Sequence, residues 1–262
     1  MSYRLHVKST VATRGILRFI LVASICLLST AGQGDELLAT RQAQTIPEEV
    51  EVYSRELNII SNNPNANKGV EGLLQLGRKA SDALVRSLSP GKADILESLS
   101  EDEFQAVVLK MKGFSVNRQE TVFVEPDPNF FIALAKRSGD QASVDFFEVY
   151  RKTKFAYFRQ QTDYNGCYLF GTLTMVDSYK QWVTYNKKYP TRYPEEVRNF
   201  IRDIEEELTG GTCACDDKES ALREFEAFIQ AFPHSKITTR IHERINQIHQ
   251  GKSDIREHCI NN

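Results

Sequence analysis

Acidic residues are missing from the start of the chain, since none precedes Asp35 in the 262-residue sequence. The same stretch carries four basic residues, Arg4, Lys8, Arg14 and Arg18. An uncharged run over 19–34 follows, and its apolar centre, 19–28, is shorter than the about 20 residues of a membrane-spanning helix. This order is typical of a secretory signal peptide. We therefore expect a signal peptide over 1–33, cleaved near residues 31–34, and a secreted or periplasmic protein. An uncleaved N-terminal anchor is the alternative.

Long runs of basic residues are also missing, because no more than two Lys or Arg stand in succession. The chain has 33 Lys and Arg, of which four leave with the signal peptide, so 29 oppose 35 Asp and Glu at a net charge of −6. A mildly acidic chain without a basic cluster is a poor nucleic-acid binder. We expect no nucleic-acid partner and no membrane span after signal cleavage.

Recognised catalytic motifs are absent as well, including the zinc-protease, nucleophile-elbow, phosphate-loop and dinucleotide patterns. His242 and His249 stand seven residues apart on a predicted helix, which places them about 10 Å apart, too far to share a metal ion. The acidic runs 101–103 and 205–207 fall on predicted helices, where we expect solvent-facing surfaces. No cofactor, metal site or catalytic residue is predicted.

Helical periodicity is present along nearly the whole mature chain. Apolar residues recur at helical spacing, Ser100 and Glu103 form a capping-box pattern, and Asp127 followed by proline is typical of a helix start. Only residues 114–125 alternate apolar and polar side chains, which predicts a short β-hairpin. The expected fold class is all-α, built from helical hairpins.

The last ninety residues contain an internal repeat. Three aromatic residues and a proline recur 43 positions later: Trp182, Tyr185, Tyr189 and Pro190 match Phe225, Phe228, Phe232 and Pro233. Three aliphatic residues beyond them recur at 44 positions: Val197, Ile201 and Ile204 match Ile241, Ile245 and Ile248. This pattern predicts two copies of one helical hairpin, 171–189 with 195–208 and 217–232 with 236–250.

An aromatic stripe that ends in a proline resembles the tetratricopeptide class of helical repeats. The resemblance implies a TPR-like α-solenoid, or an irregular helical array, that serves as a scaffold for a binding partner. The mature chain, at about 230 residues, is long enough to bury a core. We divide it into a flexible N-terminus over 34–46, an N-terminal helical region over 47–160 and a repeat region over 161–262.

Four cysteines remain after the signal peptide, each at the edge of a predicted hairpin: Cys167, Cys213, Cys215 and Cys259. An even number in an exported chain favours two disulfides. A bond between the near neighbours Cys213 and Cys215 is strained, so Cys167 and Cys259 each pair with one of them, in either combination. Zinc binding by the four thiolates, or by three with His258, and redox activity of the Cys-x-Cys pair are the alternatives.

A polar, turn-forming segment before the repeat is a candidate binding surface. It carries Gln161, Asp163 and Tyr164, and a disulfide from the adjacent cysteine would hold it rigid; a simple connector is the alternative role. We add the repeat residues Trp182 and Tyr185 to this surface, with core packing as their alternative.

These observations predict an exported, non-enzymatic helical module that binds a protein or peptide, whose identity the sequence does not reveal. The alternative is a secreted hydrolase with a site assembled from Glu125, Asp127, Asp163 and Tyr164. A concave pocket that unites these carboxylates favours the hydrolase, whereas a flat, aromatic-rich groove along the repeat favours binding.

Overall fold

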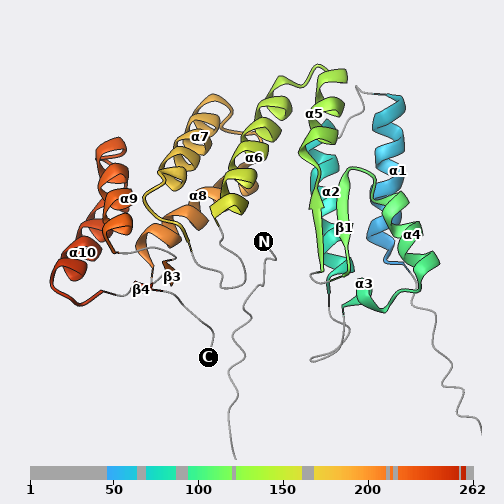
Figure 1. Ribbon diagram of the computed structural model, residues 1–262. Helices are drawn as coiled ribbons and strands as arrows, with labels where there is room; N and C mark the ends of the chain where they lie inside the picture. Colours follow the sequence, from blue (N-terminus) through green and yellow to red (C-terminus); the bar gives the residue numbers. More distant parts are fainter. Residues whose placement is uncertain are drawn as a thin grey trace, which may run out of the picture. The chain divides into compact units, whose positions relative to one another are not determined.

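A computed structural model describes residues 46–63, 69–86, 94–119, 122–160, 168–210, 213–214, 218–253 and 255–257. This part of the chain contains ten α-helices and two small two-stranded sheets (Figure 1). The predicted all-α class is confirmed. The predicted signal peptide and flexible N-terminus cover residues 1–46, of which all but residue 46 lie outside the described residues.

The first helices begin where the sequence supplies caps. Helix α1 (Glu48–Asn62) starts after a proline with three glutamates in its first turn and packs against α2 (Gly69–Leu84). A short helix, α3 (Ile95–Ser98), precedes α4 (Glu101–Lys110). The predicted capping box is confirmed, because the Ser100 N–H donates to the Glu103 carboxylate at 2.8 Å and the Ser100 hydroxyl accepts from the Glu103 N–H at 3.4 Å.

The predicted β-hairpin is confirmed. Strand β1 (Phe114–Asn117) pairs antiparallel with β2 (Phe123–Pro126), so that Phe114 faces Pro126. Helix α5 (Pro128–Arg137) follows directly, and Asp127 accepts the backbone N–H of Asn129 at 2.9 Å as its N-cap. Helix α6 (Gln141–Gln160) packs along α5 and leads toward the repeat region.

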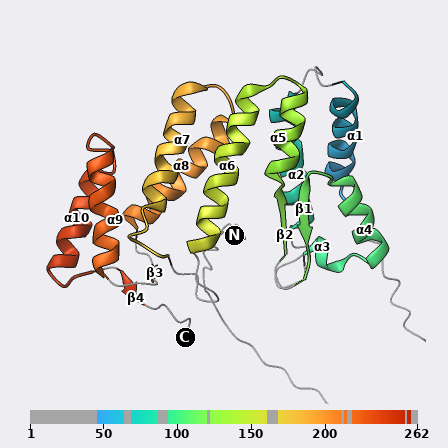
Figure 2. The ribbon, with the colours of Figure 1, turned by 45° about the horizontal axis from the view of Figure 1, so that its top comes forward.

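The two predicted hairpins are both present. Helices α7 (Thr174–Lys188) and α8 (Pro194–Thr209) form the first, and α9 (Lys218–Ala231) and α10 (Thr238–His249) form the second. Helix α7 packs against α9 and α8 against α10, so equivalent helices are neighbours (Figure 2). Two further strands, β3 (Cys213–Ala214) and β4 (Arg256–Glu257), pair in parallel.

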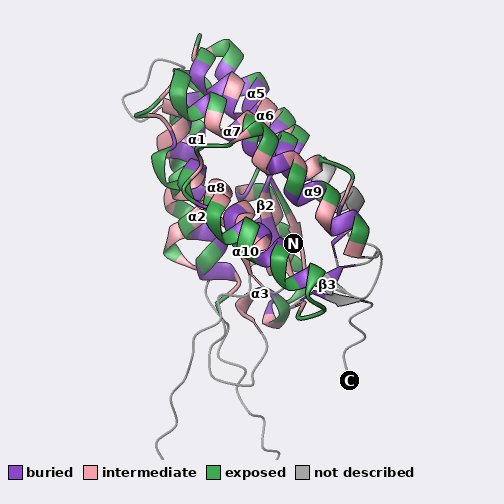
Figure 3. Cartoon of the chain, turned by 90° about the vertical axis from the view of Figure 1, so that its left-hand side faces the viewer, coloured by how far each residue is buried: buried purple, intermediate pink, exposed green. Residues whose placement is uncertain are grey.

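One hydrophobic core runs from α1 to α8 and therefore crosses residue 160. Aromatic rings dominate it, and buried and exposed residues alternate along each helix (Figure 3). Trp182 lies in this core, where its ring stacks on Phe200 with centroids 4.4 Å apart. A second core joins α7, α8, α9 and α10, and Ile201 and Ile204 contact both cores.

The repeat has one informative substitution inside the second core. The positions of Trp182 and Phe200 correspond to Phe225 and Arg244 in the second hairpin. Arg244 lies over the Phe225 ring, with the guanidinium carbon 4.9 Å from the centroid. It is 3% exposed and donates to the Glu207 carbonyl near the end of α8 at 2.9 Å. A cation over a ring thus replaces the ring stack of the first hairpin.

Both helices of the first hairpin start at a residue with positive φ, Leu173 at 63° and Tyr193 at 50°. Neither residue caps its helix with its own side chain. Instead Glu224 of α9 accepts the Leu173 N–H at 2.7 Å, and Glu71 of α2 accepts the Tyr193 N–H at 2.8 Å. Carboxylates from distant helices therefore stabilise these two helix starts.

Candidate functional site

Two of the five residues predicted to form a binding surface are buried. Trp182 and Tyr185 are 1% and 4% exposed, and the Tyr185 hydroxyl donates to the Ala142 carbonyl at 3.2 Å. Both side chains belong to the core, so the structure removes them from the predicted surface. Gln161, Asp163 and Tyr164 lie outside the described residues.

Glu125 and Asp127, the two described carboxylates of the hypothetical hydrolase site, each interact with a neighbouring group of the fold. Glu125 on β2 forms an ion pair with Lys154 of α6, which also lies over the Tyr150 ring. Asp127 caps α5. Asp163 and Tyr164, the other two members of the hypothetical site, lie outside the described residues. The described geometry therefore gives Glu125 and Asp127 roles in holding β2 and α5 in place.

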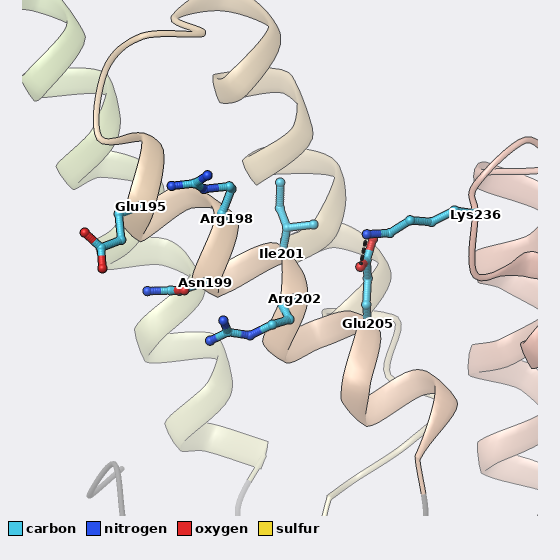
Figure 4. A pocket seen from close by; sticks show the side chains of 7 residues that line it. All are labelled: Glu195, Arg198, Asn199, Ile201, Arg202, Glu205 and Lys236. Atoms are coloured by element: carbon cyan, nitrogen blue, oxygen red, sulfur yellow. Dashed lines mark ion pairs between the residues drawn. The ribbon is translucent and has the colours of Figure 1, made fainter. Parts of the chain in front are cut away.

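A groove of about 500 Å³ lies on the exposed side of α8 and extends to the turn between α9 and α10 (Figure 4). Its lining combines three cations, two carboxylates, an amide and one aliphatic side chain: Glu195, Arg198, Asn199, Ile201, Arg202, Glu205 and Lys236. Six of the seven residues come from one helix, where residues 195–205 span about 15 Å of its axis. The groove is therefore an elongated site with charged walls beside an apolar contact point.

Glu205 and Lys236 close the end of the groove nearest the second hairpin. Lys236 Nζ lies 2.9 Å from Glu205, and the Tyr179 hydroxyl donates to the same carboxylate at 3.1 Å. The hydrogen bond to Glu205 raises the pKa of Lys236, and burial raises the pKa of Tyr179. Glu205 is only 7% exposed, so the expectation of a solvent-facing acidic run over 205–207 is wrong at this position.

The two arginines of the groove have weaker partners. Arg198 donates from Nε to the Pro194 carbonyl of its own helix at 3.1 Å. Arg202 lies 3.4 Å from Asp203 and 3.6 Å from Glu206, and its side chain is 58% exposed. Exposed pairs of this kind contribute about 0 to 1 kcal/mol. Both guanidinium groups can therefore exchange these weak contacts for stronger hydrogen bonds to a carboxylate of a bound partner.

The seven lining side chains limit the chemistry of the groove. None is a Ser, Thr, Cys or His, the usual sources of a nucleophile or of a general base near neutral pH. Two arginines at i and i+4, an amide and an isoleucine instead suit the recognition of carboxylates beside an apolar group.

Two buried polar clusters hold the first hairpin from either side. Burial raises the pKa of Glu224, although backbone N–H groups at the start of α7 donate to it. On the other side, Arg192 donates to Glu71 and to Asp140, each at 2.7 Å. Burial raises the pKa of Asp140, but hydrogen bonds from Arg192 and Ser143 outweigh it and lower the pKa overall. Both clusters position α7 and α8, and hence the groove.

The predicted cysteine sites lie at the margin of the described structure. The backbone of Cys213 belongs to β3, whereas Cys167, Cys215 and Cys259 lie outside the described residues. Within the described ranges, no three His, Cys, Asp or Glu side chains are grouped to hold a metal ion. His242 and His249 are both exposed on α10.

No family model, curated protein or solved structure matches this chain. No helix in the described ranges is both long and apolar enough to cross a membrane.

Sequence reasoning missed the groove, although a signal for it was present. On α8 the polar residues Glu195, Arg198 and Arg202 follow each other at intervals of three and four. This stripe runs beside the buried stripe that carries Val197, and a stripe of paired arginines identifies a helix face suited to carboxylates. The sequence did not predict that Lys236 lines the groove, because this residue belongs to the next hairpin.

Proposed function

We propose that the mature chain is an exported, non-enzymatic helical module that binds a protein or peptide in the periplasm, in the cell envelope or outside the cell. Binding takes place in the α8 groove, and the bound segment is acidic with at least one apolar side chain. The observation that carries the proposal is the pair Arg198 and Arg202, one helical turn apart beside Ile201, with only weak partners of their own.

The charges of the groove favour an acidic segment. The mature chain is net negative, yet this groove combines three cations with two carboxylates. Glu205 is already engaged by Lys236 and Tyr179. Arginine forms paired hydrogen bonds with carboxylates, which add directional specificity to the charge attraction. An apolar side chain of the partner would contact Ile201 between the charged walls.

The repeat architecture supports the same function. Glu224 and Glu71 hold the starts of α7 and α8, so the helix that carries the groove is positioned by its neighbours on both sides. A site held on a rigid helix loses little conformational entropy when a ligand binds. The resemblance to tetratricopeptide repeats, scaffolds for binding partners, agrees with this role.

Binding can be tested with synthetic peptides and the mature protein. A fluorescent peptide of alternating Glu and Leu is the probe, and its Gln and Leu analogue is the uncharged comparison. We expect anisotropy to report binding of the acidic peptide that weakens steeply as salt is added, with much weaker binding of the analogue.

Variants locate the site. Arg198→Ala with Arg202→Ala should weaken binding of the acidic peptide by about tenfold or more, the loss expected for one charged hydrogen-bonded contact. The matched control is Arg137→Ala with Arg240→Ala, which removes two exposed arginines from α5 and α10. Equal binding by both double variants, or equal affinity for the two peptides, would overturn the proposal.

A further inference from the structure

The end of the α8 groove nearest the second hairpin has a carboxylate that works against an acidic partner. Glu205 lines the groove and is buried. A buried charge is screened less by salt than an exposed one, and like charges that meet across an interface lower the affinity. An acidic segment in the groove is therefore repelled at this end unless a cation neutralises Glu205.

Lys236 supplies that cation from the turn between α9 and α10. Its Nζ lies 2.9 Å from the Glu205 carboxylate, and Figure 4 shows the lysine side chain reaching across the end of the groove to this ion pair. The lysine side chain is 76% exposed, whereas that of Glu205 is 9% exposed. A solvent-facing ammonium group thus covers a buried carboxylate.

Neighbouring elements hold both members of the ion pair in place. Tyr179 of α7 donates its hydroxyl to Glu205 at 3.1 Å, and its ring packs against that of Phe232 with centroids 4.8 Å apart. Ile237, the residue after Lys236, is 4% exposed and belongs to the second core. The ion pair is therefore a fixed feature of the groove, built from both hairpins.

The net charge of the groove depends on this lysine. Three cations and two carboxylates line the groove, which leaves one net positive charge. Without the charge of Lys236, two arginines face two carboxylates and the net charge is zero. Removal of both charges of the ion pair leaves the net positive charge unchanged.

We propose that the Glu205–Lys236 ion pair sets the preference of the groove for acidic segments, because Lys236 shields the buried carboxylate from the bound partner. This inference rests on the function proposed for the groove. Lys236 stays with Glu205 when the partner binds, since its release would leave a buried carboxylate without its cation, which is strongly unfavourable. The second hairpin therefore determines the charge specificity of a groove that the first hairpin carries.

Anisotropy with the fluorescent Glu and Leu peptide and the mature protein tests the shield. Lys236→Met should weaken binding by about fivefold or more, whereas Lys236→Arg keeps the charge and should bind within about twofold of wild type. The matched control is Lys252→Met, which removes an exposed lysine of the same hairpin beyond the other end of α10. This control should leave the affinity unchanged.

The decisive variant combines Lys236→Met with Glu205→Gln. Because it removes both charges, its affinity should return to within about twofold of wild type. A double variant that binds as weakly as Lys236→Met would show that the lysine binds the peptide directly, and would overturn the inference.

Glu205→Gln alone gives a second test that leaves the lysine in place. The glutamine oxygen can still accept the Tyr179 hydroxyl, and the unopposed lysine charge should strengthen binding of the acidic peptide by about twofold or more. Weaker binding would overturn the inference. Circular dichroism verifies that each variant is folded.

The arginine variants separate this inference from the proposed function. If Arg198→Ala with Arg202→Ala loses binding while Lys236→Met binds like wild type, the inference alone is wrong. If wild type does not bind the acidic peptide, the proposed function is wrong and the inference fails with it.

Discussion

Glu224 offers the sharpest test of how the fold is held together. It lies on α9 with 1% of its surface exposed, and its carboxylate caps the start of α7. Three backbone N–H groups donate to it, from Gly171 at 3.0 Å, Leu173 at 2.7 Å and Val176 at 3.3 Å. Replacement by alanine leaves these donors, of which the Val176 N–H is buried and the other two are part-buried, without their acceptor.

The expected loss follows from those donors. A buried polar group left without a partner costs about 1 to 3 kcal/mol, and the three losses are not additive because water or a small shift relieves part of them. We expect Glu224→Ala to lower the free energy of unfolding by about 3 to 5 kcal/mol, a large share of the stability of an ordinary domain. Urea unfolding followed by far-ultraviolet circular dichroism measures it.

The pH dependence tests the same carboxylate. Burial raises the pKa of Glu224 above its value in the unfolded chain. The part of its stabilising contribution that depends on protonation is therefore complete below the unfolded pKa of about 4.3 and is lost as the pH rises through the folded pKa. The difference in unfolding free energy between wild type and Glu224→Gln should be larger at about pH 4 than at about pH 7.

A matched control separates this effect from general damage to α9. Glu226 is an exposed glutamate on the same helix, and Glu226→Ala should change stability by less than about 0.5 kcal/mol. Equal stability of Glu224→Ala and Glu226→Ala would contradict the capping role of Glu224. A gap between wild type and Glu224→Gln that grows as the pH rises would contradict the raised pKa of this carboxyl group.

Three further stability changes are expected. Leu173 has a φ of 63° and is 42% exposed, so Leu173→Gly should relieve backbone strain and stabilise the protein by about 0.5 kcal/mol. Leu109→Gly, at a 78% exposed position within α4, should instead cost about 1 kcal/mol in the same urea assay. Arg192→Met removes the bonds to Glu71 and Asp140 and should cost about 2 kcal/mol at neutral pH. The pKa of Asp140 is lowered in the folded state, so the part of this loss that depends on Asp140 should shrink as the pH falls below about 4. Urea unfolding across that pH range measures the difference in stability between wild type and Arg192→Met. A difference that stays constant would contradict this expectation.

Local signals predicted the fold well. The capping box of Ser100 and the cap of Asp127 each depend on residues within one helical turn, and the repeat is visible as a period of 43 residues. The structure contains each of these features. The aromatic stripe was correctly placed on helices, but periodicity does not say whether the side chains of such a stripe are buried. Trp182 and Tyr185 consequently belong to the core.

Features that depend on distant partners were not predictable. Leu173 starts α7 with positive φ because Glu224, 51 residues away, accepts its N–H. Glu205 is buried against partners outside its own helix, Tyr179 of α7 and Lys236 of the turn between α9 and α10. Strands β3 and β4 have two residues each, too few for any alternation of side chains to be visible. In each case tertiary contacts, rather than local preference, determine the conformation.

Arg244, which takes the place of the Phe200 ring in the second hairpin, makes the cores of the two hairpins chemically different. If the second hairpin occupied the place of the first, Arg244 would lie where Phe200 stacks on Trp182, away from the Glu207 carbonyl that it now contacts. A buried guanidinium without its acceptor is strongly unfavourable. We infer that this single charge disfavours packing of the second hairpin in the place of the first while the chain folds.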